Sequence, residues 1–255
     1  MVTNFLEEYR MRIQILNLVE GARKAKGLTV VIDVFRAFST ACFLQANGAE
    51  RIIPIADLNL AYRIKREHPS FVLIGERGGI KQPGFDYGNS PVQIKDVDFS
   101  GKTVILTTSA GTQGIQNAKG ATEILTGSFL NAGAVIRYIQ KQNPSYLSLV
   151  CMGHEAVTPT EEDTLLADYI QSVLEGKPID LSDAPQRLRY TSGRRFFDPA
   201  TQDSQPEADF YLCLERDRFP FVLRAEPLPL DTVLSPKESK DLLDGSLFEL
   251  RPLYP

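Results

Sequence analysis

The chain contains short, unbroken runs of Val, Ile and Leu, and these runs restrict its fold more than any other feature. One run spans Leu28–Ile32, and similar runs span Phe71–Ile74 and Thr103–Leu106. A strand inside a parallel sheet is covered by helices on both faces, so it is apolar throughout instead of alternating with polar residues. Segments of helical length separate the runs, and this alternation predicts a three-layer α/β/α fold with a mainly parallel sheet.

Other segments continue the alternation along the chain. Further strands are predicted at Met11–Leu16, Arg51–Ile55, Glu123–Thr126 and Tyr146–Met152. Helices are predicted at Asn4–Arg10, Asp57–His68, Gln113–Lys119, Leu130–Gln142 and Glu161–Leu174. A short helix that ends at Lys24 and another that ends at about Asn47 are also predicted. Thr29-Val-Val-Ile32 resembles Thr103-Val-Ile-Leu106. Asn47-Gly-Ala-Glu50 likewise resembles Lys119-Gly-Ala-Thr122. This repeat suggests two similar halves, from an internal duplication or a pseudo-twofold arrangement.

The composition changes in the last third of the chain. We expect residues 1–182 to form the α/β core, and residues 183–255 to complete the fold with terminal strands and a surface tail. The polar stretch Gly193–Glu207 predicts an exposed connection. Leu212–Leu214 and Phe221–Leu223 predict a terminal hairpin or edge strands, and the proline-spaced residues after Pro227 predict the tail.

Composition and charge exclude several classes of protein. The 255 residues are 43% hydrophobic and 24% charged, with a formal charge of −4 and no basic stripe, which argues against a nucleic-acid partner. No apolar run approaches the roughly 20 residues of a membrane span, and the N-terminus lacks an apolar signal region. The three cysteines are scattered in apolar contexts, so we expect reduced, mostly buried thiols and a cytoplasmic protein.

Polar loops follow four of the predicted strands. They contain Asp33 and Arg36; then Glu76, Arg77, Asp86, Asn89 and Ser90 in the glycine-rich loop Gly75–Pro91; then Thr107, Thr108, Ser109, Gly111 and Thr112; and finally His154, Glu161, Glu162 and Asp163. Ligands of such sheets bind outside the carboxyl ends of the strands. We therefore expect these loops to converge on one rim and form a site there.

Each of these groups also has a structural interpretation. Asp33 could be a metal ligand or a nucleophile, or it could cap the helix that follows; Arg36 could neutralise a bound anion. The Thr107–Thr112 loop could bind phosphate at a helix N-terminus, or its hydroxyl groups could simply cap that helix. His154 could be an acid or base, or a rim residue held by capping. The charges at Glu161–Asp163 suit the first turn of a helix, and one of them could reach a metal.

Several known phosphate-handling signatures are absent. The chain has no glycine loop followed by Gly-Lys-Ser/Thr and no GxGxxG that opens a helix. It also lacks an Asp-x-Asp pair at the end of an apolar run, a Cys-x5-Arg loop and an Arg-His-Gly motif.

The motifs in these loops resemble those of the 2-phosphosulfolactate phosphatase family over roughly residues 11 to 175. They are Val31-Ile-Asp-Val-Phe-Arg-Ala37, Ile74-Gly-Glu-Arg-Gly-Gly79, Pro83-Gly-Phe-Asp-Tyr-Gly-Asn-Ser-Pro91, Thr107-Thr-Ser-Ala-Gly-Thr112 and Gly127-Ser-Phe-Leu-Asn-Ala132. The resemblance implies an α/β phosphatase that depends on Mg²⁺. It implies release of inorganic phosphate from 2-phospho-3-sulfolactate, a step of coenzyme M biosynthesis, and it favours a homodimer.

The resemblance and the carboxylate content together assign roles to the loop residues. We expect Asp33, Arg36, Glu76 and Arg77 to be catalytic, and Asp33, Glu76, Asp86, Glu162 and Asp163 to supply the Mg²⁺ ligands. We expect phosphate or substrate contacts from Asn89, Ser90, Thr107, Thr108, Ser109, Gly111, Thr112 and Ser128. Either a metal-held water attacks phosphorus, or Asp33 attacks it to give an aspartyl phosphate.

The chain departs from the family pattern at positions on the substrate side. Phe38-Ser39, Ser109-Ala110 and Gly153-His154-Glu155-Ala156 stand where the family commonly has other residues. The phosphatase chemistry therefore carries over better than the sulfonate substrate. The alternatives are action on another small phospho-acid, a lyase or isomerase that uses the same rim, and a non-catalytic protein that binds small anions.

Overall fold

The computed structural model describes residues 11–235 and 247–255, so the predicted helix Asn4–Arg10 lies outside the described residues. The strands are β1 (Arg12–Asn17), β2 (Gly27–Ile32), β3 (Arg51–Pro54), β4 (Val72–Arg77), β5 (Ile80–Lys81), β6 (Thr103–Thr107), β7 (Ala121–Gly127), β8 (Tyr146–Cys151), β9 (Val222–Leu228) and β10 (Leu247–Leu253). The α-helices are α1 (Leu18–Lys24), α2 (Ala37–Ala46), α3 (Leu58–Glu67), α4 (Pro91–Ile94), α5 (Gly111–Asn117), α6 (Ala132–Gln142), α7 (Glu161–Leu174), α8 (Ala184–Tyr190) and α9 (Glu207–Leu214). Short 3₁₀ turns are η1 (Phe129–Asn131), η2 (Arg194–Phe197), η3 (Pro199–Thr201) and η4 (Leu230–Thr232).

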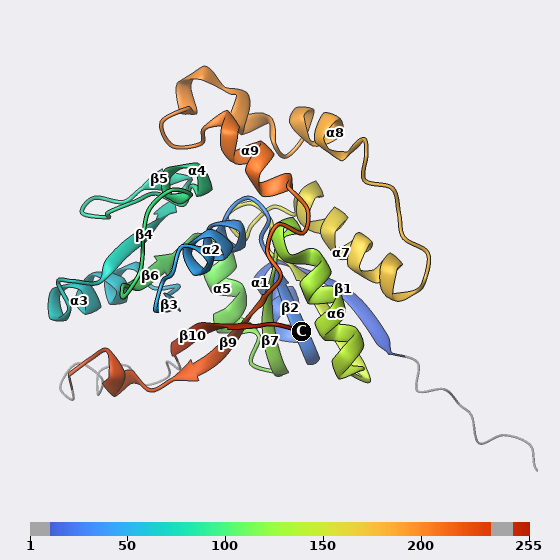
Figure 1. The fold of residues 1–255 in the computed structure, drawn as a ribbon, viewed down its shortest axis with the longest axis horizontal. Helices are drawn as coiled ribbons and strands as arrows, with labels where there is room; N and C mark the ends of the chain where they lie inside the picture. The colour runs from blue at the N-terminus through green and yellow to red at the C-terminus, as the bar shows by residue number, and fades with distance from the viewer. Residues whose placement is uncertain (1–10, 236–246) are drawn as a thin grey trace, which may run out of the picture.

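The described strands form one sheet in the order β1-β8-β2-β7-β9-β10-β3-β6-β4-β5. Strands β1, β8, β2 and β7 are parallel to one another, and so are β3, β6 and β4. The antiparallel pair β9–β10 lies between these two groups and joins them, as Figure 1 shows. The predicted mainly parallel sheet is therefore confirmed.

The two parallel groups run in opposite directions, because three successive antiparallel pairings separate β7 from β3. The four polar loops nevertheless line one cavity, so the expected convergence is confirmed. They meet where the crossover helices α2 and α5 touch at their N-termini. A Cβ atom placed on Gly111 would lie 2.8 Å from the Cβ of Ala37, so the two helices approach as closely as a glycine allows.

Helices cover both faces of the sheet and form its three layers. Neighbouring strand residues alternate between two cores, as side chains on a pleated strand must. Val31, Ile52 and Leu106 pack with α2 and α5 in a core that spans both groups. On the opposite face, Val30 packs with α6 and α7, whereas Ile53 packs with α3. The three-layer α/β/α prediction is confirmed.

The C-terminal segment differs most from what the sequence predicts. Leu212–Leu214 belongs to helix α9, and not to a strand. The expected surface tail is wrong for the described residues beyond 246, because β10 pairs with both β9 and β3 in the middle of the sheet. Gly193–Glu207 is not a simple exposed connection either, since Phe196 is fully buried. The sequence gives no sign of the central place of β10, because the choice of a strand's pairing partners is not a local property of its sequence.

Two smaller predictions, the length of the glycine-rich loop and the internal repeat, can be compared with the structure. The loop Gly75–Pro91 is shorter than expected, since β4 extends to Arg77 and pairs with β5. The pairings β2–β7 and β6–β3 lie on either side of β9–β10, but an internal duplication stays a prediction, as does a division of the chain at residue 182.

In the described part of the chain, no helix is long and apolar enough to cross a bilayer. The three cysteines are buried and unpaired.

The central position of β10 predicts a large effect of truncating its buried side chain. Leu250 is 2% exposed and belongs to the core between the helices α2 and α5 and the sheet. Leu250→Ala should lower the free energy of unfolding by about 2–5 kcal/mol. The control Tyr254→Ala, at a side chain that is 68% exposed, should change it by less than about 1 kcal/mol. Urea denaturation measures both, and equal effects of the two substitutions would contradict the placement of β10.

Candidate active site

A small polar cavity of about 30 Å³ lies where the loops after β2, β4, β6 and β8 meet the C-terminal segment. It is lined by Asp33, Phe35, Arg36, Glu76, Gly79, Asn89, Ser109, Ala110, Gly153, His154, Glu155, Arg195 and Gln205. The cavity therefore brings together six of the residues that the sequence analysis selects: Asp33, Arg36, Glu76, Asn89, Ser109 and His154.

Asp33 is buried at the point where α2 and α5 approach each other. It is 4% exposed, and its Oδ1 accepts a hydrogen bond from the backbone N–H of Ala37 at 3.1 Å. Burial raises its pKa to about 7; repulsion from Glu76 adds to this, while the N–H groups of Ala37 and Gly111 and the charge of Arg195 oppose it. A side chain at position 111 would meet Oδ2 of Asp33 at 2.9 Å. Asp33 thus caps α2 and also faces the cavity, so both interpretations of the sequence apply.

Glu76, at the end of β4, fixes the wall opposite Asp33. Its Oε1 accepts a hydrogen bond from Ser109 N at 2.7 Å. Its Oε2 accepts from Gly79 N at 2.7 Å and from Ser109 Oγ at 3.1 Å. These bonds tie the β4–β5 hairpin to the loop before α5 and orient the carboxylate, which is only 6% exposed.

Arg36 is held by a buried ion pair from the C-terminal segment. Its Nη1 donates to Oδ2 of Asp209 and to the carbonyl oxygen of Ser204, both at 2.8 Å. Arg36 is 4% exposed and Asp209 is fully buried. Burial raises the pKa of Asp209 and Arg36 opposes that rise. Removing either partner would leave an unpaired buried charge, so this pair anchors α9 beside the cavity.

Arg195 supplies the second positive charge at the cavity. It donates hydrogen bonds to the carbonyl oxygen of Phe35, at 2.9 Å, and to Nδ1 of His154. Nδ1 of His154 is therefore the acceptor, which leaves the proton of the neutral ring on Nε2. Burial and the charge of Arg195 lower the pKa of His154, and burial lowers the pKa of Arg195.

Several predicted site residues have structural partners and do not line the cavity. Arg77 donates to the carbonyl oxygens of Glu76 and Ala56 and to Thr107 Oγ1. Thr108 and Thr112 bond to each other across the first turn of α5. Ser128 forms a capping box with Asn131, and Ser90 lies beside the Asp209 carboxylate. The capping interpretation thus fits Thr108 and Thr112, whereas the Thr107 hydroxyl accepts from Arg77. Ser109 and Gly111 are the predicted members that lie at the cavity or at Asp33.

The predicted metal ligands separate into two groups. Asp86 accepts from Leu73 N at 2.8 Å and pairs with Lys65, away from the cavity. Both oxygens of Asp163 accept backbone N–H groups, from Val34 at 2.9 Å and Gly153 at 2.8 Å. Glu162 is buried beside Arg195 and does not line the cavity. Asp33 and Glu76 are the two that do.

The donor set at the cavity fits a magnesium ion. Among the described residues, no group of three or more His, Cys, Asp or Glu could hold a metal. Mg²⁺ does not require such a group, since it keeps several waters and often binds through one or two carboxylates plus substrate phosphate. Asp33 and Glu76 provide two carboxylates that repel each other without a cation. The buried Oδ1 of Asn89, which has no hydrogen-bond partner in the described ranges, provides a third hard oxygen.

Three residues of the C-terminal segment line the cavity or hold its wall and are missed by the sequence analysis: Arg195, Gln205 and Asp209. All three lie in or next to the stretch expected to be an exposed connection. The sequence Arg194-Arg195-Phe196-Phe197 was the available signal, because paired aromatic residues are unusual in a solvated loop. Phe196 packs against Phe35, with ring centroids 5.0 Å apart, and so brings Arg195 to the cavity.

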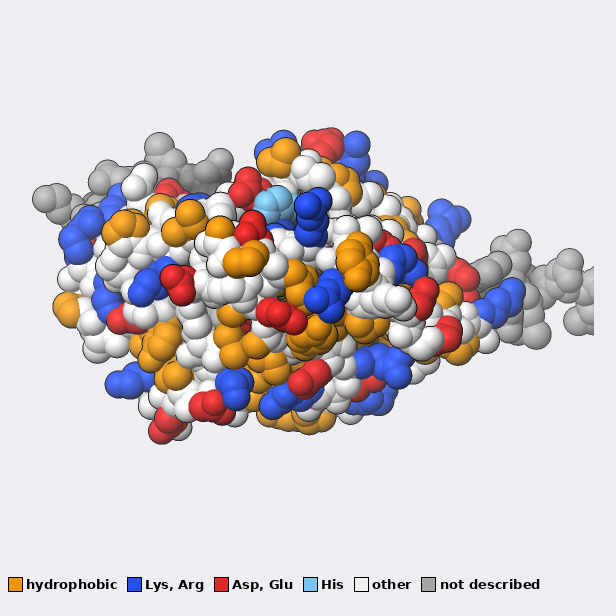
Figure 2. All heavy atoms as spheres, turned by 90° about the horizontal axis from the view of Figure 1, so that it is seen from above, with side chains coloured by type: hydrophobic (Ala, Val, Ile, Leu, Met, Phe, Trp, Pro, Cys, Tyr) orange, Lys and Arg blue, Asp and Glu red, His pale blue; other side chains and the backbone are white. Residues whose placement is uncertain are grey.

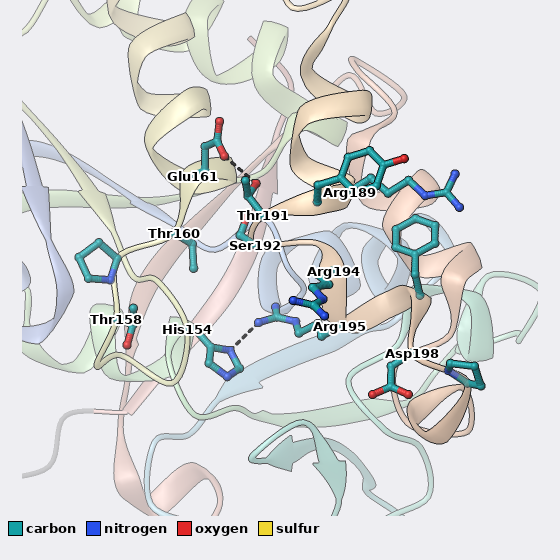
Figure 3. Close-up of a pocket in the computed structure, with 14 residues that line it drawn as sticks. His154, Thr158, Thr160, Glu161, Arg189, Thr191, Ser192, Arg194, Arg195 and Asp198 are labelled. Carbon is teal, nitrogen blue, oxygen red and sulfur yellow. Dashed lines mark hydrogen bonds between the residues drawn. The ribbon is translucent and has the colours of Figure 1, made fainter.

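A wide basin of about 1360 Å³ adjoins the small cavity and shares His154 and Arg195 with it (Figure 3). Its other walls come from the loop before α7, from the end of α8 and from the η2 and η3 turns. Figure 2 looks down on the molecule from the side of α8 and α9, and shows Lys and Arg side chains beside a histidine near the middle of this face. The small cavity therefore opens into a space lined by the C-terminal segment.

Two carboxylates and two guanidinium groups around one cavity of an α/β fold suit an enzyme of the phosphoryl-transfer class. Comparison with known proteins gives the particular family. Residues 13–226 match the 2-phosphosulpholactate phosphatase family. The chain belongs to this family of phosphoric monoester hydrolases.

Three similar proteins are each named "Probable 2-phosphosulfolactate phosphatase". The chain is 44% identical to the protein of Caldicellulosiruptor saccharolyticus over 55% of its own length and 59% of the relative's. It is 40% identical to that of Carboxydothermus hydrogenoformans over 68% of the chain and 72% of the relative. It is 30% identical to that of Thermoplasma volcanium over 79% of the chain and 92% of the relative.

The raised pKa of Asp33 predicts that the site is maintained at the expense of stability. The folded protein binds the carboxyl proton of Asp33 more tightly than the unfolded chain does. The contribution of Asp33 to the free energy of unfolding is therefore favourable below about pH 4 and is lost as the pH rises through about 7. Above pH 7 the buried, ionised Asp33 lowers the free energy of unfolding by about 4 kcal/mol, and Asp33→Asn removes this penalty. The substitution also weakens one hydrogen bond, which is worth about 1 kcal/mol. With a chelator present, the variant should therefore be more stable than wild type at pH 8 by on the order of 1–3 kcal/mol.

Urea denaturation at pH 4 and pH 8 measures this difference. The exposed Asp203 provides a matched control, since Asp203→Asn should leave the pH dependence of unfolding unchanged. An Asp33→Asn protein that is less stable than wild type at pH 8 would show that the buried carboxylate stabilises the fold.

Proposed function

We propose that the protein hydrolyses the phosphate ester of 2-phospho-3-sulfolactate and releases 3-sulfolactate and inorganic phosphate. The observation that carries the proposal is the cavity itself, in which Asp33 and Glu76 face Arg36 and Arg195. Family membership and the names of the relatives support the substrate. The dependence on Mg²⁺ is part of the proposal, and a role in coenzyme M biosynthesis, a cytoplasmic location and a homodimer stay predictions.

Asp33, Glu76 and the Oδ1 of Asn89 are the groups that would hold the magnesium ion. When bound, Mg²⁺ neutralises phosphoryl oxygens and lowers the pKa of a coordinated water. Two carboxylates without such a cation would repel a phosphate ester. The repulsion from Glu76 that adds to the effect of burial on the pKa of Asp33 is thus also a reason for the ion.

The arginines and the histidine provide the remaining contacts to the phosphoryl group. Arg195 is held by Phe35 O and His154, so its guanidinium is oriented before substrate arrives. A fixed positive charge of this kind stabilises the charge on the equatorial oxygens in the transition state. His154 carries its proton on Nε2, which makes it a hydrogen-bond donor at the junction of the cavity and the basin. Arg36 completes the wall and is kept in place by Asp209.

Phosphate release by matched variants tests the proposal. Wild type should release phosphate from 2-phospho-3-sulfolactate with Mg²⁺ and lose this activity in chelator, and Asp33→Asn should lower kcat by about 10³-fold or more, because it removes a carboxylate that acts on the reacting group. Asp86→Asn is the control, since the sequence predicts this residue as a ligand but the structure places it with Leu73 and Lys65. It should retain activity within about threefold.

Two outcomes would contradict the proposal. Equal losses in Asp33→Asn and Asp86→Asn would mean that the cavity does not hold the reacting group. No phosphate release by wild type, together with phosphate binding that survives Asp33→Asn and needs no Mg²⁺, would favour a non-catalytic anion-binding protein.

A further inference from the structure

The basin beside the cavity contains positive charge that the phosphoryl site does not use. Arg189, Arg194 and Arg195 line it, and Figure 3 shows Arg194 and Arg195 close together on the η2 turn. Two carboxylates also line it, Glu161 and Asp198, but both have partners. Glu161 pairs with Arg187 and accepts a hydrogen bond from Thr191, and Asp198 accepts one from Ala200 N at 2.9 Å.

Arg194 and Arg195 are consecutive in the sequence, but only Arg195 reaches the small cavity. Arg195 lines both the cavity and the basin, and two of its five N–H groups are donated to His154 and to the carbonyl oxygen of Phe35. Arg194 lines the basin but not the cavity. It is exposed, and no hydrogen bond or ion pair of its guanidinium group is found among the residues that the structure describes. Their Cα atoms are about 3.8 Å apart, and consecutive side chains of a 3₁₀ turn point in directions about a third of a turn apart. A small ligand can therefore contact both guanidinium groups from opposite ends.

Arg189 adds a second guanidinium to the basin. Its Cζ lies 4.3 Å from the ring centroid of Phe197, so the aromatic face holds the group without neutralising its charge. No carboxylate in the described part of the chain forms an ion pair with it. The basin therefore offers two guanidinium groups, from Arg189 and Arg194, that remain available to an anion.

We propose that Arg194, assisted by Arg189, binds the acidic tail of the substrate and so selects a phospho-acid that carries a further sulfonate. This inference rests on the proposed function. With the phosphoryl group between Asp33 and Arg195, a three-carbon substrate extends past His154 into the basin, where its sulfonate meets Arg194. A sulfonate stays anionic at every physiological pH, and the planar guanidinium matches its oxygens in a bidentate contact. Arg194 is a specificity residue in this arrangement, and Arg195 acts on the phosphoryl end.

A pair of substrates separates these two roles. The substrates are 2-phospho-3-sulfolactate and 2-phospholactate, in which a methyl group replaces the sulfomethyl group. Arg194→Ala should lower kcat/KM for the sulfonate substrate by about 10- to 100-fold, mostly through KM, because it removes a charge-assisted hydrogen bond. It should change kcat/KM for 2-phospholactate by less than about threefold. Arg195→Ala should lower kcat for both substrates.

Two further variants complete the kinetic test. Arg194→Lys should keep part of the preference, because an ammonium group retains the charge but loses the planar fork. Arg137→Ala is the matched control, an exposed arginine on α6 outside both the cavity and the basin, and it should change neither substrate. Equal losses for both substrates in Arg194→Ala, or no loss for either, would overturn the inference.

Direct binding keeps the inference separate from the proposed function. Calorimetric titration with 3-sulfolactate should show weaker binding to Arg194→Ala than to wild type by about 10-fold or more. If wild type releases no phosphate from either ester, the proposed function fails, and this titration still decides the inference. Unchanged affinity of Arg194→Ala for 3-sulfolactate would overturn it, and circular dichroism of the variant confirms that it is folded.

Discussion

The antiparallel pair β9–β10 is the constraint on which the rest of the structure depends. Two groups of parallel strands run in opposite directions, and this pair joins them. Strand β10 reaches β3 through one backbone pairing, and Arg51 adds an ion pair to Glu249 at 3.1 Å. The joined halves allow α2 and α5 to meet at their N-termini, and that meeting places Asp33 opposite Glu76. Residues from the end of the chain thus decide the geometry of loops near its beginning.

The site concentrates buried acidic groups that stability alone would not favour. Burial raises the pKa of Asp33, Glu162, Asp163 and Asp209. Backbone N–H groups compensate Asp33 and Asp163, Arg36 compensates Asp209, and the charge of Arg195 opposes the rise for Glu162. The unfavourable solvation of these groups is the physical expense of a preorganised anion site, because fixed donors and charges do not have to reorganise during the reaction. The same donors hold together four loops that are far apart in the sequence.

Much of the fold follows from the sequence, but the site follows from it only in part. The apolar run that ends at Asp33 predicts both a buried strand and a polar residue at its carboxyl end, and Asp33 and Glu76 are found at the cavity. Asp86 is also an aspartate in a polar loop that follows a strand, yet it accepts a hydrogen bond from the N–H of Leu73. The sequence cannot separate these cases, because a carboxylate that binds a backbone N–H and one that faces a cavity follow the same local pattern. Arg195 is missed for the opposite reason: the aromatic packing of Phe196 that brings it inward is long-range.

The sequence by itself determined the type of layers, most strands and the chemical character of the loops, because the period of apolar residues and the position of polar residues at strand ends are local properties. It also determined the family, through motifs that are contiguous along the chain. Only the tertiary structure decided that the two parallel groups run oppositely, that β10 is central, and that Arg195 completes the cavity. Those features depend on pairings between different segments of the chain, and the free energy of such contacts leaves no periodic trace in the segments that make them.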